Sequence, residues 1–198
     1  MNYQWKVVNH EIVYRGYFRM EKYDIDHEKY AGGMTGQFQR EIFERGSAVA
    51  VIPYDPVHDK VVLIEQFRAG AIGSMEQPWM KEIVAGIIEP GESQSDVANR
   101  ETMEEAGCKI LELEKISQYF VSPGGTTEQC ALYYGRVDSD GVGGIHGLEH
   151  EFEDIRVEVV DLAQADAWVQ DGTINSAASI IGIQWLMLNR ERLRNPVR

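Results

Sequence analysis

Three glutamates, Glu101, Glu104 and Glu105, follow one another at short intervals within the stretch from Gly86 to Cys108. On a helix, residues four apart share one face, with their Cβ atoms about 6 Å from each other. Two like charges in that arrangement destabilise a bare helix by roughly 0.2–0.5 kcal/mol. We therefore expect a positive group between Glu101 and Glu105, and carboxylate oxygens suit a hard divalent ion such as Mg²⁺. This spacing indicates a metal-dependent enzyme.

The full stretch has a more specific spacing. Gly86 is followed after five residues by Glu92, and after seven more by the run Arg100-Glu101-Thr102-x-Glu104-Glu105-x-Gly107. This arrangement resembles the Nudix box, the signature of hydrolases that cut nucleoside diphosphates linked to another group. Thr102 and Cys108 stand where bulkier or plainly aliphatic residues are common in the family, and both can pack as small, semi-apolar groups.

The resemblance implies a set of metal ligands and one orienting group. Glu101, Glu104 and Glu105 would bind Mg²⁺, or Mn²⁺ in its place, and the backbone carbonyl of Ala85 and the carboxylate of Glu153 would join them. Arg100 would orient the catalytic glutamates, and it can also pair with Glu104 four residues further along a helix. Glu92 would support this network rather than bind metal. The alternative is a solvated acidic helix face, which is the usual meaning of E-x-x-E-E.

The segment 138–154 is rich in glycine and acids and offers a further catalytic carboxylate. Hydrolysis of a pyrophosphate needs neutralisation of its oxygens, an activated water and a base that takes the proton. The segment resembles the catalytic loop of ADP-ribose pyrophosphatases, including the run G-I-H-G-L. By position, Glu151 matches the general base and Glu153 a second acid near the metal. His146 and His150 are weaker candidates for the base, and without the Nudix box the segment would more often be a disordered tether.

The turn Ser122-Pro123-Gly124-Gly125-Thr126-Thr127-Glu128 bears on the choice of substrate. Pro123 lies sixteen residues after Gly107, the spacing that marks the ADP-ribose pyrophosphatase branch of the family. Proline and two glycines allow a tight turn whose backbone N–H groups can face an anion. Ser122, Gly124 and Glu128 are the candidate substrate contacts, with Glu128 accepting hydrogen bonds from ribose hydroxyls. The alternative is an ordinary hairpin turn.

Three further residues are candidates for substrate binding. Arg68 follows an apolar strand, and its guanidinium can hold a phosphate at two points, although a surface arginine is an equally good interpretation. Tyr17 and Arg40 rest on the resemblance alone. In the resembling enzymes the N-terminal region swaps between subunits, and an aromatic side chain and an arginine there sandwich the adenine of the partner's substrate. The resemblance thus implies a homodimer through the N-terminal sheet.

The composition excludes some partners. The chain of 198 residues carries 32 Asp and Glu against 19 Lys and Arg, a formal net charge of −13. Binding to a nucleic-acid backbone depends on basic residues, so we expect no nucleic-acid partner. No apolar run approaches the roughly 20 residues that span a bilayer, and the N-terminus lacks the apolar core of a signal peptide. Cys108 and Cys130 are expected to be free buried thiols, and the chain is predicted to be cytoplasmic.

The elements that must position these residues mix helices and strands. Residues 4–45 indicate three short strands, and Ser93 or Ser95 can begin a helix that Gly107 ends. Segments 68–81 and 138–154 are expected to be irregular. The remaining elements are predicted as strands at 48–54, 60–67, 82–88, 109–120, 130–137 and 155–160, and as helices at 162–172 and 176–194.

This order is typical of an α/β or α+β protein with a mixed sheet. The resemblance specifies the α/β class, as a Nudix α/β/α sandwich with a small N-terminal antiparallel sheet. We expect residues 1–45 to form the N-terminal β-sheet region, which dimerises and swaps, and residues 46–198 to form the Nudix catalytic domain.

The predicted activity is Mg²⁺-dependent hydrolysis of ADP-ribose to AMP and ribose 5-phosphate by a water that metal and Glu151 activate. One alternative is a pyrophosphatase for another nucleoside diphosphate sugar, such as GDP-mannose. Another is a catalytically silent domain that senses a nucleotide sugar, although such domains typically lose box glutamates and all are present here. A structural Ca²⁺ site does not fit, because Ca²⁺ loops place their acids in a turn with a central glycine.

Overall fold

The structure is a computed structural model that describes residues 2–195, and it divides into two compact units. The smaller unit runs from the N-terminus to Ser47 and includes Phe120–Gln129. The larger unit consists of Ala48–Tyr119 and Cys130–Arg198. The chain thus leaves the larger unit once, between the strands that precede and follow Phe120–Gln129.

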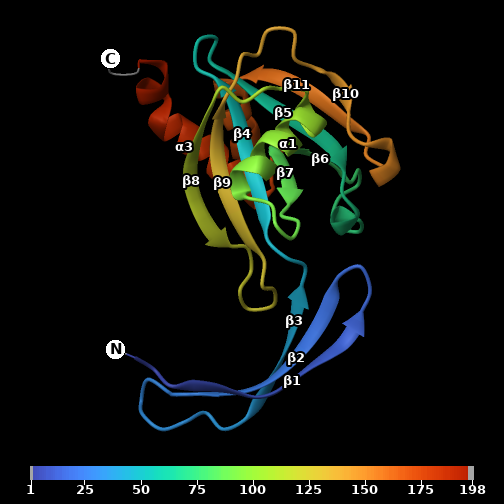
Figure 1. The fold of residues 1–198 in the computed structure, drawn as a ribbon. Coiled ribbons are helices and arrows are strands. Elements are labelled where there is room, and N and C mark those ends of the chain that lie inside the picture. The colour runs from blue at the N-terminus through green and yellow to red at the C-terminus, as the bar shows by residue number, and fades with distance from the viewer. Residues whose placement is uncertain (1, 196–198) are drawn as a thin grey trace. The chain divides into compact units, whose positions relative to one another are not determined.

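The smaller unit is a three-stranded antiparallel sheet in the order β1-β2-β3 (Figure 1), as the sequence predicted. Its strands are β1 (Trp5–Arg15), β2 (Arg19–His27) and β3 (Phe38–Glu44). Every residue of the edge strand β1 is exposed, the apolar ones included. The register of β1 against β2 shifts between Val7 and Asn9 and again between Ile12 and Tyr14, which bends this edge.

The larger unit is built on a mixed sheet of eight strands within the described residues. Six of them run in the order β10-β11-β5-β4-β9-β8, while β6 pairs with β5 and β7 pairs with β4. Strands β4 and β9 are parallel, which makes the sheet mixed. The strands are β4 (Ala48–Asp55), β5 (Lys60–Phe67), β6 (Trp79–Glu82), β7 (Val84–Ile87), β8 (Glu112–Phe120), β9 (Gln129–Arg136), β10 (Gly144–His146) and β11 (Ile155–Asp161).

Strands β4 and β5 separate after a short paired base. They pair only at Tyr54 with Val61 and at Asp55 with Lys60. Beyond this base, β4 takes β7 as its antiparallel partner, and β5 takes β6. The separation lets β7, which carries Gly86, approach the helix that carries Glu101.

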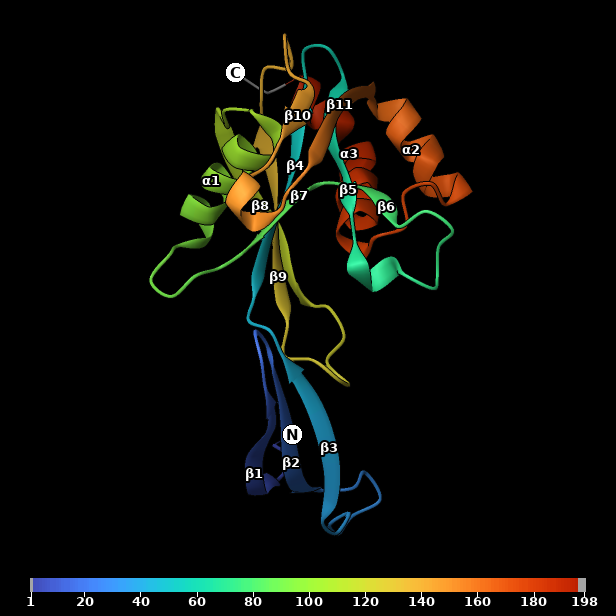
Figure 2. The ribbon, with the colours of Figure 1, turned by 90° about the vertical axis from the view of Figure 1, so that its right-hand side faces the viewer.

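Helices cover both faces of the large sheet (Figure 2), so the predicted α/β/α sandwich is confirmed. On β4, Val49 and Val51 face α1 (Gln94–Ala106), while Ala50 and Ile52 face the other two helices. Those helices are α2 (Leu162–Asp171) and α3 (Ala177–Arg194). Both sets of strand side chains are buried, so the sheet has a core on each side. No helix within residues 2–195 is long and apolar enough to cross a membrane.

Two segments differ from the sequence prediction. Segment 68–81, expected to be irregular, contains the 3-10 turn η1 (Ala69–Ala71) and the start of β6. Segment 138–154 contains β10 and a second 3-10 turn, η2 (Glu149–Glu151). Both short strands exist because a longer strand pairs with them, a non-local cause that their own residues do not announce.

Candidate active site

Helix α1 begins and ends where its capping residues require. The Ser93 hydroxyl accepts a hydrogen bond from the Asp96 N–H at 3.2 Å, which satisfies a free donor of the first turn. At the other end, Gly107 is left-handed (φ 63°) and donates its N–H to the Met103 carbonyl. Thr102 and Cys108 are buried, as predicted for small semi-apolar groups. These caps fix where the helix begins and ends. Its buried residues Val97, Ala98 and Ala106 pack with the strands and determine which face its glutamates present.

Gly86 gives Glu101 its place against the sheet. A Cβ on Gly86 would lie 1.8 Å from Oε1 of Glu101, so the carboxylate occupies the space that any side chain would take. Gly86 pairs with Val49 in the ladder between β7 and β4, and the backbone there has little room to move. The glycine at position 86 therefore leaves room for the Glu101 carboxylate against the strand.

Glu105 is the most deeply placed of the three helix glutamates. Its residue is 3% exposed, and its Oε2 accepts a hydrogen bond from the Ala85 N–H at 3.0 Å. Burial raises the pKa of Glu105 to about 8; the Ala85 N–H and the charge of Arg68 oppose the shift, while the charges of Glu101 and Glu153 add to it. Ala85, whose carbonyl is the predicted metal ligand, is thus hydrogen-bonded to Glu105 through its N–H.

Arg100 gathers the remaining carboxylates of the box. Its Nε and one terminal nitrogen donate to both oxygens of Glu92, at 3.0 and 3.2 Å. The other terminal nitrogen donates to Glu101 at 2.8 Å and to Glu104 at 3.0 Å. The hydrogen bond with Glu92, together with the other two carboxylates, raises the pKa of Arg100. Arg100 thus orients Glu101 and Glu104, and the pairing predicted with Glu104 is present.

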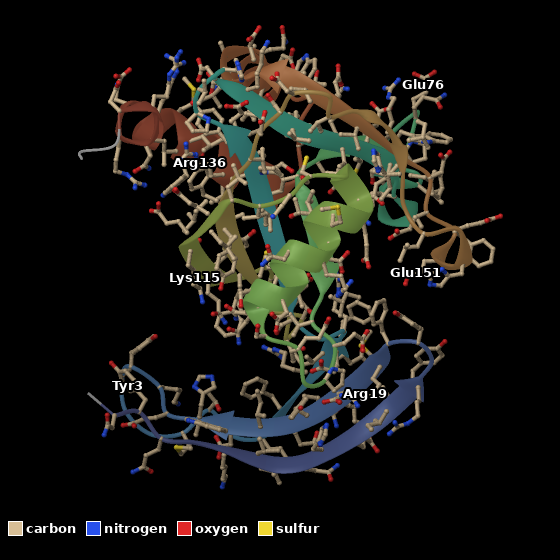
Figure 3. All side chains as sticks on the ribbon, turned by 45° about the horizontal axis from the view of Figure 1, so that its top comes forward. Tyr3, Arg19, Glu76, Lys115, Arg136 and Glu151 are labelled. Atoms are coloured by element: carbon tan, nitrogen blue, oxygen red, sulfur yellow. The ribbon has the colours of Figure 1, made fainter. Side chains whose placement is uncertain are left out.

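The segment between β9 and β11 brings Glu153 to the same site. The charge of Glu153 raises the pKa of both Glu101 and Glu105, so the three carboxylates are close enough to interact. Glu151 lies two residues earlier, at the end of η2, and is exposed (Figure 3). Nε2 of the neighbouring His150 lies 3.6 Å from Oε1 of Glu151. The structure places Glu151 on the loop of Glu153 but does not bring it into contact with the helix glutamates.

The donors that meet here suit a divalent cation by their chemistry. They are carboxylate oxygens, and the pKa values of Glu101 and Glu105 are raised first by burial and then by the neighbouring carboxylates. A cation would stabilise their ionised forms. As the side chains stand in residues 2–195, no three His, Cys, Asp or Glu are close enough together to hold a metal ion. Arg100 instead takes the free oxygens of Glu101 and Glu104.

Arg68 interacts by its charge with Glu105 of the box helix. It follows β5, and its Nε donates to Oε2 of Glu82 on β6 at 2.6 Å. Within residues 2–195 its two terminal nitrogens make no hydrogen bond, although Arg68 is close enough to Glu105 to lower the pKa of that carboxyl. Sequence reasoning named Arg68 but missed Glu82, because an ion pair between separate strands leaves no local signal.

Tyr17 and Arg40 belong to the smaller unit. Tyr17 lies at the turn between β1 and β2, is 86% exposed, and packs edge-on against Phe18 with ring centroids 4.7 Å apart. Arg40 on β3 is exposed and stacks over the ring of Phe38 at 4.6 Å from its centroid. Both side chains are therefore accessible, and both sit beside an aromatic ring.

The predicted substrate turn also lies in the smaller unit. Gly125 and Thr126 donate their N–H groups to the Ser122 carbonyl, which closes the turn around Pro123 and Gly124. Glu128 pairs with Arg45 at 3.1 Å, a partner that the sequence analysis did not name. The Glu128 carboxylate is thus held in place by a cation on a neighbouring segment.

Comparison with known proteins decides the family. The model of the NUDIX domain matches residues 44–178. The chain belongs to the Nudix family. Membership implies that the protein depends on a divalent metal ion, in agreement with the oxygen donors around Glu105.

Relatives of this Nudix protein include named enzymes. The chain is 47% identical over 190 residues to the ADP-ribose pyrophosphatase of Escherichia coli K12, covering 96% of this chain and 91% of the relative. It is 42% identical to the ADP-ribose pyrophosphatase of Haemophilus influenzae, covering 96% and 88%. A GDP-mannose pyrophosphatase of Pectobacterium atrosepticum is 29% identical, covering 90% and 91%. The crystal structure of an ADP compounds hydrolase has the same fold, with a TM-score of 0.69 at 23% identity over 94% of this chain and 96% of that one.

Proposed function

We propose that this Nudix protein hydrolyses ADP-ribose to AMP and ribose 5-phosphate, with Mg²⁺ as its divalent ion. The observation that carries the proposal is 47% identity to an ADP-ribose pyrophosphatase along almost the whole chain. The box glutamates and Arg100 are all present and gathered at one place, which argues against a catalytically silent sensor. The lower identity to a GDP-mannose pyrophosphatase, 29%, makes that substrate the second candidate.

The proposed ligands of the ion are the carboxylates of Glu101, Glu104, Glu105 and Glu153 and the carbonyl of Ala85. When bound, a divalent ion neutralises pyrophosphate oxygens and lowers the pKa of water. The protein groups then have separate tasks. Arg100, anchored by Glu92, keeps the Glu101 and Glu104 carboxylates in fixed orientations. The hydrogen bond from the Ala85 N–H does the same for Glu105.

Glu151 is the proposed general base. It takes a proton from the attacking water, whose oxygen bonds to one phosphorus as the bridging P–O bond breaks and the two phosphates separate. Glu151 is exposed at the end of a short turn, so a modest movement of the loop can bring it to the substrate. Arg68 is proposed to bind a phosphate through its terminal nitrogens, while Glu82 holds its Nε.

The smaller unit is proposed to bind the adenosine part and to form a homodimer. The exposed Tyr17 and Arg40 provide an aromatic ring and a planar guanidinium, the two groups that stack well on a base. Glu128 and the N–H groups of the turn at Ser122 and Gly124 are proposed to contact ribose and phosphate. We propose residues 1–45 as the dimerising, swapped region and 46–198 as the catalytic domain. A cytoplasmic location stays a prediction; the two free buried cysteines agree with it.

Product analysis tests the proposed reaction. The purified protein with Mg²⁺ is incubated with ADP-ribose, GDP-mannose, NADH and diadenosine polyphosphates, and the products are separated and quantified. Dominant conversion of ADP-ribose to AMP and ribose 5-phosphate is expected. Preference for GDP-mannose would keep the chemistry and replace the substrate. Binding of nucleotide sugars with no hydrolysis would make the silent sensor the better description.

A second experiment tests the base. Glu151→Gln should lower kcat by about two to four orders of magnitude, the usual range for a general base, with little change in the Kd of ADP-ribose. Glu149→Gln, an exposed acid in the same turn, is the matched control and should keep nearly full activity. If kcat of Glu151→Gln equals that of the wild type, the proton goes to another group.

A further inference from the structure

The contact between His146 and Gly107 joins the acidic loop to the end of the box helix. His146 ends β10, and Gly107 caps α1. A Cβ on Gly107 would lie 2.5 Å from Cε1 of His146 and 3.2 Å from both ring nitrogens. The imidazole therefore lies over the bare Cα of Gly107. The left-handed backbone there would tolerate asparagine, whereas the ring above it leaves no room for any side chain.

The imidazole is itself held from the other side. Its Nε2 lies 3.0 Å from the Gly143 carbonyl oxygen. A carbonyl can only accept, so Nε2 carries the hydrogen and donates it. This bond, together with the packing on Gly107, fixes the orientation of the ring. Its contacts hold the backbone of residues 143–147 in place.

A backbone hydrogen bond makes the second link between loop and helix. The Gly147 N–H donates to the Glu104 carbonyl at 3.3 Å. Carbonyls in the last turn of a helix have no partner within the helix, so the loop satisfies one that would otherwise need water. Glu104 is one of the proposed metal ligands, and its backbone is thus tied directly to the acidic loop.

Two contacts carry this link on to Glu153. The Leu148 N–H donates to Oε2 of Glu153 at 3.1 Å, and the Glu153 N–H donates to the Leu148 carbonyl at 3.2 Å. A Cβ on Gly147 would lie 2.7 Å from Cβ of Glu153, so Glu153 packs against that glycine. The position of Glu153 follows from where Gly147 is held.

We propose that His146 is a positioning residue, which by packing on Gly107 docks the acidic loop onto α1 and keeps the Glu153 carboxylate beside Glu101 and Glu105. The expected effect on kcat rests on the proposed function. The packing of His146 on Gly107, which holds the loop against α1, does not depend on metal or substrate. It explains why one residue of the box, Gly107, must lack a side chain for a reason beyond its backbone conformation.

The test compares two capping glycines. Gly107→Asn adds a side chain under the His146 ring, whereas Gly172→Asn adds one at the left-handed cap of α2, where nothing lies within 4 Å of a Cβ. Amide hydrogen exchange of the metal-free protein is measured at Gly147, together with kcat and KM for ADP-ribose. Gly107→Asn and His146→Ala should each speed exchange at Gly147 and lower kcat on the order of tenfold, with KM within about threefold. Gly172→Asn should change neither.

The double variant Gly107→Asn/His146→Ala tests whether the two single substitutions act through the same contact. If displacement of the ring is the cause, the double variant should be no worse than either single one. Wild-type exchange and kcat in His146→Ala, additive losses in the double variant, or an equal loss in Gly172→Asn would each overturn the proposal. A wild-type protein that is inactive on ADP-ribose would contradict the proposed function. Amide exchange at Gly147 in the metal-free protein would still show whether His146 holds the loop against α1.

Discussion

The surroundings of Glu105 disfavour the ionised form of its carboxyl. The carboxyl is almost fully buried, and its pKa is raised from an ordinary 4.5 to about 8. The folded protein therefore keeps a proton that the unfolded chain releases as the pH rises through 4.5. The stabilising effect of that proton is fully present below pH 4.5, falls from there, and is lost by about pH 8. A cation bound at this residue would favour the ionised form and reverse the balance.

The first prediction follows from this titration. In the metal-free protein, Glu105→Gln should be more stable than the wild type at pH 8, by at most about 5 kcal/mol, and about equal to it at pH 4.5. Urea unfolding at both pH values measures the difference. A stability difference that does not change with pH would mean that Glu105 titrates normally. The variant should also lose orders of magnitude in kcat, because a neutral amide replaces a proposed metal ligand that carries charge.

Phe152 carries backbone strain with no burial to offset it. It adopts a left-handed conformation (φ 59°) between Glu151 and Glu153, and its side chain is 97% exposed. That conformation costs a residue with a bulky side chain roughly 1–2 kcal/mol, and asparagine less. Phe152→Asn should therefore raise the free energy of unfolding by about 0.5–1 kcal/mol, read from urea unfolding, and leave kcat unchanged. A more stable variant with weaker ADP-ribose binding would show instead that the ring contacts substrate.

At the scale of elements, local signals could be predicted and pairings could not. Helix α1 was predictable because Ser93 and Gly107 mark its two ends within the chain segment itself. Strands β6 and β10 were missed because β5 and β11, distant in sequence, define them. The same distinction between local signals and long-range pairings applies to the residues of the site. The box glutamates could be named from their spacing, whereas the pairs of Arg68 with Glu82 and of Arg45 with Glu128 follow only from the fold.

The approach of α1 to β7 gives a prediction at this scale. Gly86→Ala would place a methyl group where the Glu101 carboxylate now lies. The end of a glutamate can move at low cost, so the free energy of unfolding should change by no more than about 1 kcal/mol. Displacing a proposed metal ligand should nevertheless lower kcat about 10- to 100-fold and raise the Mg²⁺ concentration needed for half-maximal activity.

Gly70→Ala is the matched control for that prediction, because a Cβ there meets nothing within 4 Å. Kinetics at several Mg²⁺ concentrations compare the two variants with the wild type. Full activity of Gly86→Ala would show that Glu101 need not lie against β7 for catalysis.

At the scale of the whole molecule, the smaller unit exposes more apolar surface than a short sheet can leave uncovered. Three strands need a packed apolar face to be stable, and a long exposed edge strand invites pairing with another chain. All of β1 is exposed. The exposed apolar residues on and beside this strand are Tyr3, Trp5, Val7, Val8, Ile12, Val13, Tyr14 and Tyr17. A second copy of the chain is the cover that the proposed homodimer supplies.

The variant Trp5→Ser/Tyr14→Ser tests this cover, since the two side chains are 73% and 66% exposed and their loss should cost the single chain little. Sedimentation velocity should show a dimer for the wild type and a monomer, or a much weaker dimer, for the variant. Leu188→Ser on α3, a residue 87% exposed in the other unit, is the control and should leave the dimer intact. If Tyr17 and Arg40 serve the partner's site, the monomer should also bind ADP-ribose more weakly. A monomer with unchanged KM would mean that each chain completes its own adenosine site.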